Sequence, residues 1–406
     1  MAISIVGVRF CNSQTLERYL TMSEINPSVA FFVGCFGGGG IERITAHLAH
    51  QLVALGVQVD LVLDKGGSPH LWRMPPETRI IDLQAPRLSM SLPGLVRYLR
   101  QECPAALLSA DHYMNEIAIL ARSISRVSTR MIVTEHNQLS QTARNASRLK
   151  GRLAPLFAQW LYPHADGIVA VSQGVAKDLA RTATLPLNRI ETIYNPVIHP
   201  EMLVLAREPI EHPWLAPGEP PVILGVGKLE AQKDFPMLIR AFATVRRSQP
   251  ARLMILGWGP DRPALEALIK ELGLEDAIEL SGYMQNPYAY MARSAVFALS
   301  SAWEGLPTVL IEAMALGIPV VSTNCESGPS EILAGGQYGD LTPVGDSDAL
   351  AASILRVLSG NVKSIDHSWL EQFWLETATQ RYLKILGIEV DQSNKHVMAS
   401  QNRGTS

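Results

Sequence analysis

The stretch from residue 297 to residue 322 constrains the fold of this chain more than any other. Phe297 to Ser300 and Ile318 to Ser322 are short apolar runs typical of buried parallel strands, and strong helix formers occupy residues 309–316 between them. A strand, a loop, a helix and a second strand in this order form one β-loop-α-β unit. In open α/β sheets, ligands bind at the carboxyl edge of such strands.

Two glutamates mark this unit. Glu304 lies in the loop, and Glu312 follows eight residues later on the helix. Both carboxylates can face the carboxyl edge of the sheet, next to a helix start whose N–H groups hold phosphate. Carboxylates accept hydrogen bonds from sugar and ribose hydroxyls, so the arrangement suits a nucleotide sugar. The alternative is that Glu312 is an ordinary helix residue and Glu304 a solvated loop residue.

The residues around the two glutamates resemble the E-x7-E signature of retaining GT-B glycosyltransferases of family four. The matching positions are Glu304, Gly305, Pro307, Glu312, Ala313, Met314, Ala315, Gly317, Pro319 and Val320. The resemblance extends over residues 29–386. It implies an α/β fold of the GT-B type, in which two Rossmann-like domains face each other across a cleft.

The length of 406 residues exceeds the size at which a single hydrophobic core stops growing, so two domains are expected. The expected order is an N-terminal acceptor-side domain (1–205), a proline-rich linker (206–221), a donor-binding domain (222–368), a helix that crosses back to the first domain (369–388) and a disordered polar tail (389–406). Residues 1–26 match nothing in the family pattern. They are interpreted as an extension, or as the result of a start codon placed upstream of Met22.

The two halves differ in charge. Residues 1–200 carry 19 Lys and Arg against 14 Asp and Glu, whereas the remainder carries 16 against 24. A basic first half suits an anionic membrane surface or a phosphorylated acceptor. A nucleic-acid partner is not expected, because no nucleic-acid motif accompanies the charge.

Cysteines and hydropathy indicate the compartment. The four cysteines are widely spaced and form no C-x-x-C pair, which predicts reduced thiols and no metal site. The chain has no apolar run of about eighteen residues and no secretory signal. These features predict a cytoplasmic protein without a spanning helix, able to lie on the inner face of the cytoplasmic membrane.

A glycine-rich loop follows the first predicted strand, at residues 29–33. Gly37, Gly38, Gly39 and Gly40 precede a predicted helix at 41–55. The N–H groups and the positive helix end make this loop a candidate anion site, although a flexible turn also explains the glycines. The loop resembles the glycine-rich first loop of the family, which lies against the donor phosphate or the acceptor.

Two histidines follow predicted core strands. His112 comes after the strand at 105–110, and His136 comes after the strand at 131–134. Either can be a packed loop residue or a ligand of the crevice. In the family that the chain resembles, a histidine at the place of His136 contacts the donor sugar, so His136 is the stronger candidate.

The segment 144–161 mixes cations with large apolar residues. Its apolar positions fall on one helical face: Leu149, Leu153, Leu156, Phe157, Trp160 and Leu161. A basic helix that bears tryptophan can make a peripheral contact with an anionic membrane. The alternative is a helix that packs on the sheet and keeps its cations in water. Gly151 and Pro155 argue against one long helix.

The second half opens with a predicted strand at 222–227, which Lys228 and Lys233 follow. Two cations at a strand end can neutralise a pyrophosphate, although exposed lysines are usually only solvated. The stretch resembles the family's G-R-L…K segment, which holds the donor diphosphate. Lys228 stands where arginine is usual and lacks its bidentate geometry, so Lys233 is the firmer assignment.

A later strand end is assigned to the nucleotide base. Gly282, Tyr283 and Met284 follow the predicted strand that begins at Ile278, and they resemble the region that lines the base in the family. The ring of Tyr283 suits a planar base. Packing of this ring into the core is the alternative.

The resemblance implies a retaining glycosyltransferase of bacterial polysaccharide or lipopolysaccharide biosynthesis. The expected donor is a UDP-hexose or UDP-N-acetylhexosamine, and the expected acceptor is a lipid-linked or glycan hydroxyl. Glu304, His136 and Lys233 are expected to be catalytic. Donor contacts are expected from Gly227, Lys228, Lys233, Gly282, Tyr283, Met284, Glu304, Gly305, Leu306, Pro307, Thr308, Val309 and Glu312. No cofactor and no metal are expected, because lysines take over the role of a metal ion.

Two alternatives remain open at this point. A nucleotide-sugar epimerase or a sugar phosphorylase shares the same two-domain layout. A non-catalytic nucleotide-sugar-binding subunit of a polysaccharide assembly complex is the alternative from a different functional class.

Overall fold

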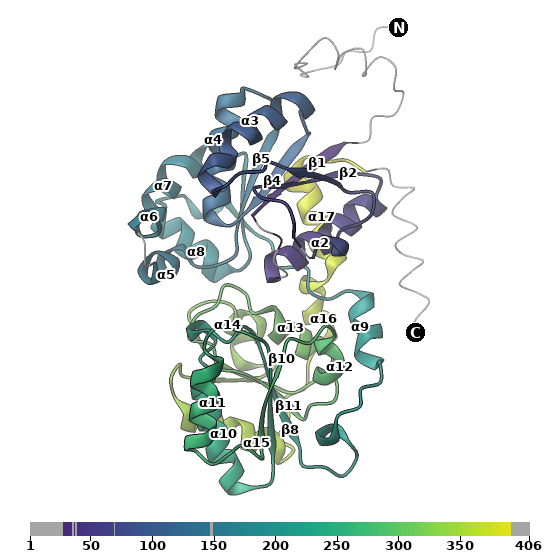
Figure 1. Cartoon of the computed structure of the whole chain (residues 1–406), viewed down its shortest axis with the longest axis vertical. Coiled ribbons are helices and arrows are strands. Elements are labelled where there is room, and N and C mark those ends of the chain that lie inside the picture. The colour runs from purple at the N-terminus through teal and green to yellow at the C-terminus, as the bar shows by residue number, and fades with distance from the viewer. Residues whose placement is uncertain (1–26, 35, 37–38, 69, 147–148, 391–406) are drawn as a thin grey trace. The chain divides into compact units, whose positions relative to one another are not determined.

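The computed structural model describes residues 27–34, 36, 39–68, 70–146 and 149–390. The chain divides into two compact units (Figure 1). The first unit comprises the described residues up to 171, residues 176–193 and those from 378 onward. The second unit comprises residues 172–175 and 194–377. Each unit is built around one parallel sheet, as the apolar strand runs in the sequence predict.

The first unit contains a seven-stranded sheet in the order β3-β2-β1-β4-β5-β6-β7, with every neighbouring pair parallel. Its strands are β1 (Ser28–Val33), β2 (Gln58–Leu63), β3 (Arg79–Asp82), β4 (Ala106–Ala110), β5 (Arg130–Glu135), β6 (Gly167–Ala170) and β7 (Ile190–Thr192). The central strands are buried on both faces, because helices cover the two sides of the sheet.

The helices of the first unit connect successive strands. They are α2 (Gly40–Ala54), α3 (Ser91–Glu102), α4 (His112–Ser125), α5 (Leu139–Asn145), α6 (Leu149–Arg152), α7 (Ala154–Leu161) and α8 (Gln173–Thr182), the last shared with the second unit. Helix α4 packs against both α3 and α7, and the three lie side by side (Figure 1).

The second unit contains a six-stranded parallel sheet in the order β10-β9-β8-β11-β12-β13. Its strands are β8 (Val222–Val226), β9 (Arg252–Leu256), β10 (Ile278–Gly282), β11 (Val296–Leu299), β12 (Val320–Thr323) and β13 (Asp340–Thr342). Its helices are α9 (Pro200–Arg207), α10 (Phe235–Ser248), α11 (Arg262–Glu271), α12 (Pro287–Met291), α13 (Thr308–Ala315), α14 (Pro329–Ile332), α15 (Ser347–Leu358) and α16 (His367–Leu370).

Strand order reverses in the middle of the second sheet. The chain proceeds outward from β8 to β9 and β10, and then returns to place β11 on the other side of β8. The loops after β8 and β11 therefore diverge from one point of the carboxyl edge. Such a topological switch point is where open α/β sheets bind ligands.

The boundary between the units differs from the prediction. The first unit was expected to extend to residue 205 and a linker to follow, but residues 194–221 group with the second unit. The reason is that α9 packs on α12. Asn286 Nδ2 donates to the Leu205 carbonyl over 2.8 Å, and Arg293 donates to the carbonyls of Ala206 and Glu208 over 3.2 and 2.9 Å.

The last described helix, α17 (Leu375–Leu386), spans both units. From Ala378 onward it groups with the first unit, where Tyr382, Leu383 and Leu386 join the hydrophobic core beside β1 and α2. The predicted extension and most of the predicted tail lie outside the described residues. So do Cys11 and Cys35, whereas Cys325 is buried, and burial raises the pKa of its thiol to about 12.

The segment 144–161 is not one helix. It contributes the end of α5 and the short helices α6 and α7, which Gly151 and Pro155 help to separate. Arg148 lies outside the described residues. Across the described ranges, no helix is both long and apolar enough to cross a membrane.

Candidate functional site

Lys233 and Glu304 form the centre of the candidate site in the second unit. Lys233 ends the short helix η6 (Ala231–Lys233) just after β8, and Glu304 lies in the loop between β11 and α13. Lys233 Nζ lies 2.5 Å from Glu304 Oε1, and the two side chains are 18% and 6% exposed. The pair therefore bridges the two loops that diverge at the switch point.

Two serines hold this pair in place. Ser301 Oγ donates to Glu304 Oε1 over 2.7 Å, and Ser300 Oγ donates to the Lys233 carbonyl over 2.7 Å. A charged pair whose side chains are already ordered loses little conformational entropy when a ligand binds.

The loop after Glu304 leads directly into α13. Gly305, Leu306 and Pro307 are buried, and Thr308 begins the helix with Val309 beside it, both partly exposed. Glu312 lies one helical turn beyond Thr308 and is 1% exposed. A buried carboxylate is costly unless polar groups surround it, so Glu312 is not the ordinary solvated helix residue that the alternative interpretation required.

The loops after β8 and β9 meet through glycine. Gly257 has a φ of +152°, and a Cβ at this position would lie 1.8 Å from the Gly227 carbonyl oxygen. The side chain of Lys233 also lies against Gly227, since its Cγ, Cδ and Cε are 3.2 Å from where a Cβ would stand. The close approach of these backbones requires glycine at 257 and fixes the loop that carries both lysines.

Trp258 is a residue of this edge to which sequence reasoning assigned no role. It follows β9 and is 58% exposed, and Lys228 Nζ lies 5.9 Å from its ring centroid. This distance is within the range of a cation–π interaction. Glycines flank it at positions 257 and 259, and no pattern in the sequence distinguishes the tryptophan between them. Only the exposed ring in the structure marks it.

Tyr283 follows β10 and is 51% exposed, so its ring is not part of the core. Gly282 before it has a φ of +79°, and Met284 after it is half-buried. Because the sheet order is β10-β9-β8-β11, the polar and aromatic groups along the carboxyl edge follow the order Tyr283, Trp258, the two lysines and Glu304. Aromatic rings, cations and a carboxylate thus succeed one another along one edge.

His136 belongs to the first unit, at the end of β5. Thr134 Oγ1 donates to the Ser109 carbonyl over 2.9 Å and lies 3.2 Å from His136 Nε2. Because the single hydroxyl proton is already used, Nε2–H is assigned as the donor in the second contact, and Nδ1 becomes an acceptor. Burial lowers the pKa of His136 to about 4, so its imidazole is neutral at pH 7.

His112 begins α4 in the same unit and is packed, not open to solvent. Its Nδ1 lies 2.6 Å from Asp111 Oδ1, and the residue is 7% exposed. Burial alone would lower the pKa of His112, but the bond to Asp111 and the nearby charges of Glu135 and Glu116 raise it overall.

A buried polar network beside these histidines was not predicted. Asn115 Nδ2 donates to Glu135 Oε1 over 3.1 Å and to Tyr162 Oη over 3.0 Å, and Tyr162 also donates to Glu135. Burial raises the pKa of Glu135 to about 7 despite the opposing charge of His112. The network joins three separate segments, so no local pattern in the sequence reveals it.

Only part of the glycine-rich loop can be described. Gly37 and Gly38 lie outside the described residues, Gly39 is the N-cap of α2 and Gly40 its first residue. A Cβ on Gly39 would lie 2.7 Å from Glu42 Oε2, so a carboxylate is already beside this helix start. Within the described ranges, no three His, Cys, Asp or Glu side chains gather as a metal site.

Comparisons with known proteins identify the family. The model of the family "Glycosyltransferase Family 4" matches residues 38–199, and that of "Glycosyl transferases group 1" matches residues 206–370. One relative is the N-acetylgalactosamine-N,N'-diacetylbacillosaminyl-diphospho-undecaprenol 4-alpha-N-acetylgalactosaminyltransferase of Campylobacter jejuni. It is 30% identical over 345 residues, which cover 81% of this chain and 90% of the relative.

The chain belongs to glycosyltransferase family 4. A second relative is the lipopolysaccharide core biosynthesis glycosyltransferase LpsE of Rhizobium meliloti, 26% identical over 361 residues, which cover 86% of this chain and 96% of LpsE. Membership makes this chain a glycosyltransferase, as its glutamate signature predicts.

Solved structures show that this family 4 member has the GT-B fold. The lipopolysaccharide outer core galactosyltransferase WaaB aligns with a TM-score of 0.68 at 23% identity, over 88% of this chain and 99% of WaaB. Anabaena HepE in complex with UDP aligns with a TM-score of 0.67 at 20% identity, over 89% of this chain and 100% of HepE. The predicted fold class is therefore confirmed.

Proposed function

We propose that this glycosyltransferase moves a sugar from a UDP-sugar to a hydroxyl of a lipid-linked acceptor in surface-polysaccharide biosynthesis, with retention at the anomeric carbon. The observation that carries the proposal is the ion pair of Lys233 with Glu304 at the switch point of the second sheet. The Campylobacter relative supports the acceptor class, because its name specifies a diphospho-undecaprenol substrate. HepE, of the same fold, supports UDP as the nucleotide.

The order of groups along the edge matches the order of groups in the donor. Breaking the anomeric bond places positive charge on the sugar ring and negative charge on the departing diphosphate. Lys233 Nζ would stabilise the diphosphate, with Lys228 as a second and more exposed cation. Charge from these two lysines removes the need for a resident metal ion in this proposal.

Glu304 would bind the transferred sugar. Lys233 and Ser301 both approach its Oε1, and we assign Oε2 to the sugar hydroxyls. Glu312, buried on α13, would accept hydrogen bonds from the ribose hydroxyls. Tyr283 and Trp258 would contact the base, because both rings are exposed at the end of the edge that precedes the lysines.

The first unit would supply His136 and the acceptor site. A neutral imidazole with an accepting Nδ1 can take a hydrogen bond from a sugar hydroxyl, whereas an imidazolium cannot. The part of the glycine-rich loop that starts α2 would face a polar or anionic group of the substrate, with Glu42 limiting the charge that the helix start can hold.

A binding screen tests the donor assignment. A ligand that binds only the folded protein raises its melting temperature. We expect a shift with UDP and UDP-sugars, none with GDP- or ADP-sugars, and loss of the shift in Lys233→Met. Lys270→Met, an exposed lysine on α11, is the matched control and should keep the shift. A shift with GDP-sugars alone would overturn the UDP assignment.

A turnover assay separates transfer from the alternatives. With the active donor and a polyprenyl-diphosphate-linked sugar, UDP release should require the acceptor, and NMR of the product should show the anomeric configuration of the donor. An epimerised sugar without acceptor would indicate an epimerase. Sugar phosphate formed from inorganic phosphate would indicate a phosphorylase, and binding without any turnover a non-catalytic subunit.

A further inference from the structure

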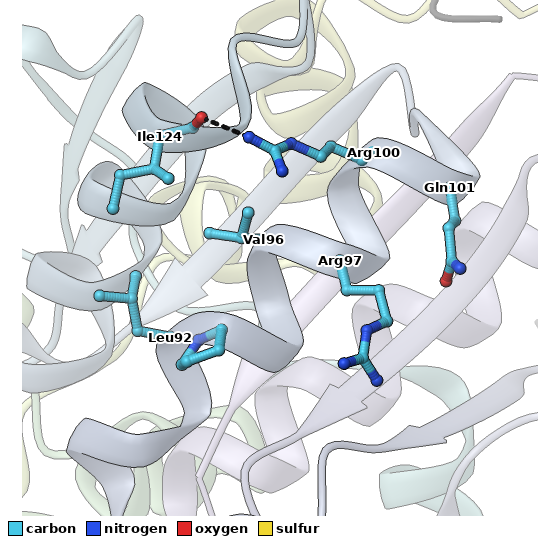
Figure 2. Close-up of a pocket in the computed structure, with 7 residues that line it drawn as sticks. Leu92, Val96, Arg97, Arg100, Gln101 and Ile124 are labelled. Carbon is cyan, nitrogen blue, oxygen red and sulfur yellow. Dashed lines mark hydrogen bonds between the residues drawn. The ribbon is translucent and has the colours of Figure 1, made fainter.

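A groove between α3 and α4 marks an outer surface of the first unit that the glycosyl-transfer site does not use (Figure 2). Leu92 and Val96 of α3 and Ile124 of α4 form its apolar floor. Arg97 and Arg100 stand on its rim, and Arg100 Nη2 donates to the Ile124 carbonyl over 3.0 Å. The groove therefore combines an apolar surface with guanidinium groups.

Apolar residues continue from this groove onto the neighbouring helices. Leu120 and Ile124 of α4 are 39% and 49% exposed, and Leu156 and Trp160 of α7 are 52% and 71% exposed. Each pair is four residues apart, so its members lie on the same side of their helix. Because α4 packs between α3 and α7, the exposed sides of the three helices are adjacent.

Helix α7 packs against its neighbours through small residues and exposes two of its large ones. Its buried residues are Ala154 and Ala158, whereas Leu156 and Trp160 face outward, as does Leu149 of α6 with 71% exposure. Single exposed hydrophobic residues are ordinary on a protein surface. Five of them on helices that pack against one another concentrate apolar surface in one region, as interaction surfaces do.

The charge of this face favours an anionic partner. Arg97, Arg100, Arg126, Lys150 and Arg152 are all exposed around the apolar residues. The only acidic residues on α3, α4, α6 and α7 are Glu102 and Glu116. Glu102 accepts a hydrogen bond from Arg79 over 2.8 Å, and Glu116 is 6% exposed and interacts electrostatically with Lys150, so the arginines of this face keep the surface positive.

A second copy of the chain fits this face less well. A two-fold contact sets a patch against itself. It would bring the arginines of one copy against those of the other, and the one exposed carboxylate on these helices, Glu102, already pairs with Arg79. Anionic lipid headgroups pair with all of the cations, and the layer beneath them accepts Leu156, Trp160 and Ile124.

We infer that the outer face of α3, α4, α6 and α7 docks on an anionic lipid bilayer. The inference extends the membrane contact predicted for residues 144–161 to a composite surface that includes the groove of Figure 2. It agrees with a lipid-linked acceptor but does not depend on the proposed transfer. Vesicle binding is measured without substrate, so its failure would leave the proposed function intact.

Vesicle flotation of the full chain tests the inference. We expect the protein to float with vesicles of phosphatidylcholine that contain about 30% phosphatidylglycerol, and to float much less with phosphatidylcholine alone. Salt at about 0.5 M should release most of the protein, because it screens the headgroup charge. Equal recovery with the two lipid compositions would overturn the inference.

Two sets of variants locate the contact. Arg97→Glu with Arg126→Glu should weaken partitioning about tenfold or more, because both side chains are exposed at this face. Arg240→Glu with Arg247→Glu on α10 makes the same change of charge in the second unit and should have little effect.

Leu156→Ala with Trp160→Ala should weaken vesicle binding about tenfold through lost apolar contact. Leu187→Ala, at a residue 50% exposed elsewhere in the first unit, is the control.

Three results would contradict the assignment. This face is not the contact if the Arg97→Glu, Arg126→Glu variant binds vesicles as well as the wild type does. The same conclusion follows if the α10 control variant loses as much vesicle binding as this variant. A concentration-dependent dimer that the same variants dissociate, without vesicle binding, would assign the face to a second copy. Melting curves of every variant, compared with that of the wild type, identify any that fail to fold.

Discussion

Lys233 Nζ lies 2.5 Å from Glu304 Oε1, although the two residues are 71 positions apart in the chain. Their side chains are 18% and 6% exposed, so each charge is largely shielded from water and depends on the other. A diphosphate at this edge would compete with Glu304 for the ammonium group. The hydroxyls of the transferred sugar would offer Glu304 replacement donors. Donor binding and the ion pair are therefore linked in the proposed site.

Removal of one partner of this pair should affect both stability and activity. Lys233→Met is expected to lower the free energy of unfolding by about 1–3 kcal/mol, since the Glu304 carboxylate stays buried without its ammonium partner. Glu304→Gln should cost less stability, because an amide can still accept from Ser301. Both variants should lose about 100-fold or more in kcat/KM. Urea denaturation and initial transfer rates measure the two effects.

The double variant Lys233→Met with Glu304→Gln separates the roles. We expect it to regain most of the lost stability, because no unpaired charge remains, while transfer stays as low as in the single variants. Recovery of transfer together with stability would show that the pair only holds the loops.

Gly257 should be intolerant of a side chain. Gly257→Ala would place a Cβ 1.8 Å from the Gly227 carbonyl, at a φ of +152°. We expect a loss of about 3 kcal/mol or more in unfolding free energy, because the loop after β8 must shift. Gly273→Ala is the control, since Gly273 also has a positive φ of +64° but has no atom within 4 Å of the added Cβ. It should cost about 1 kcal/mol. Similar losses in both variants would refute the close-contact explanation.

Much of the second unit follows from the sequence because its signals are local. The strand at 296–299, the loop of Glu304 and the helix from Thr308 are consecutive, and their apolar runs and glycines determine them directly. The domain boundary depended instead on contacts between distant segments. Nothing near Leu205 indicates that Asn286 will bind its carbonyl, so the helix there was assigned to the wrong side of the boundary.

The orientation of α7 shows a second limit. Periodicity places Leu156 and Trp160 on one face, but it does not say which face meets the sheet. Ala154 and Ala158 form the buried face, Phe157 and Leu161 are half-buried, and Leu156 and Trp160 remain outside. The role of Trp258 was missed for a related reason, because exposure of one ring at a strand end depends on the neighbouring loops.

Trp258 offers a test of the base-binding end of the site. Trp258→Ala should weaken UDP binding roughly 5- to 150-fold, because stacking on an aromatic ring contributes about 1–3 kcal/mol per base. Trp258→Phe should retain much of the affinity. Trp160→Ala removes an exposed tryptophan from the outer helices of the first unit and should leave UDP affinity unchanged. Titration calorimetry with UDP measures each value, and unaltered affinity in Trp258→Ala would exclude contact with the base.

Glu135 should make stability depend on pH. Burial raises its pKa from the ordinary value of 4.5 to about 7, so between these values the folded state holds a proton that the unfolded state has released. Its contribution is full below pH 4.5 and is lost as pH rises to about 7, with an upper limit of about 3 kcal/mol. Glu135→Gln cannot titrate and should remove this loss of unfolding free energy between pH 4.5 and about 7. An unchanged pH profile in Glu135→Gln, measured by urea denaturation, would show that other groups govern it. His136 acts in the opposite direction, because burial lowers its pKa from the ordinary value of 6.5 to about 4, and its contribution to stability therefore rises with pH between these values.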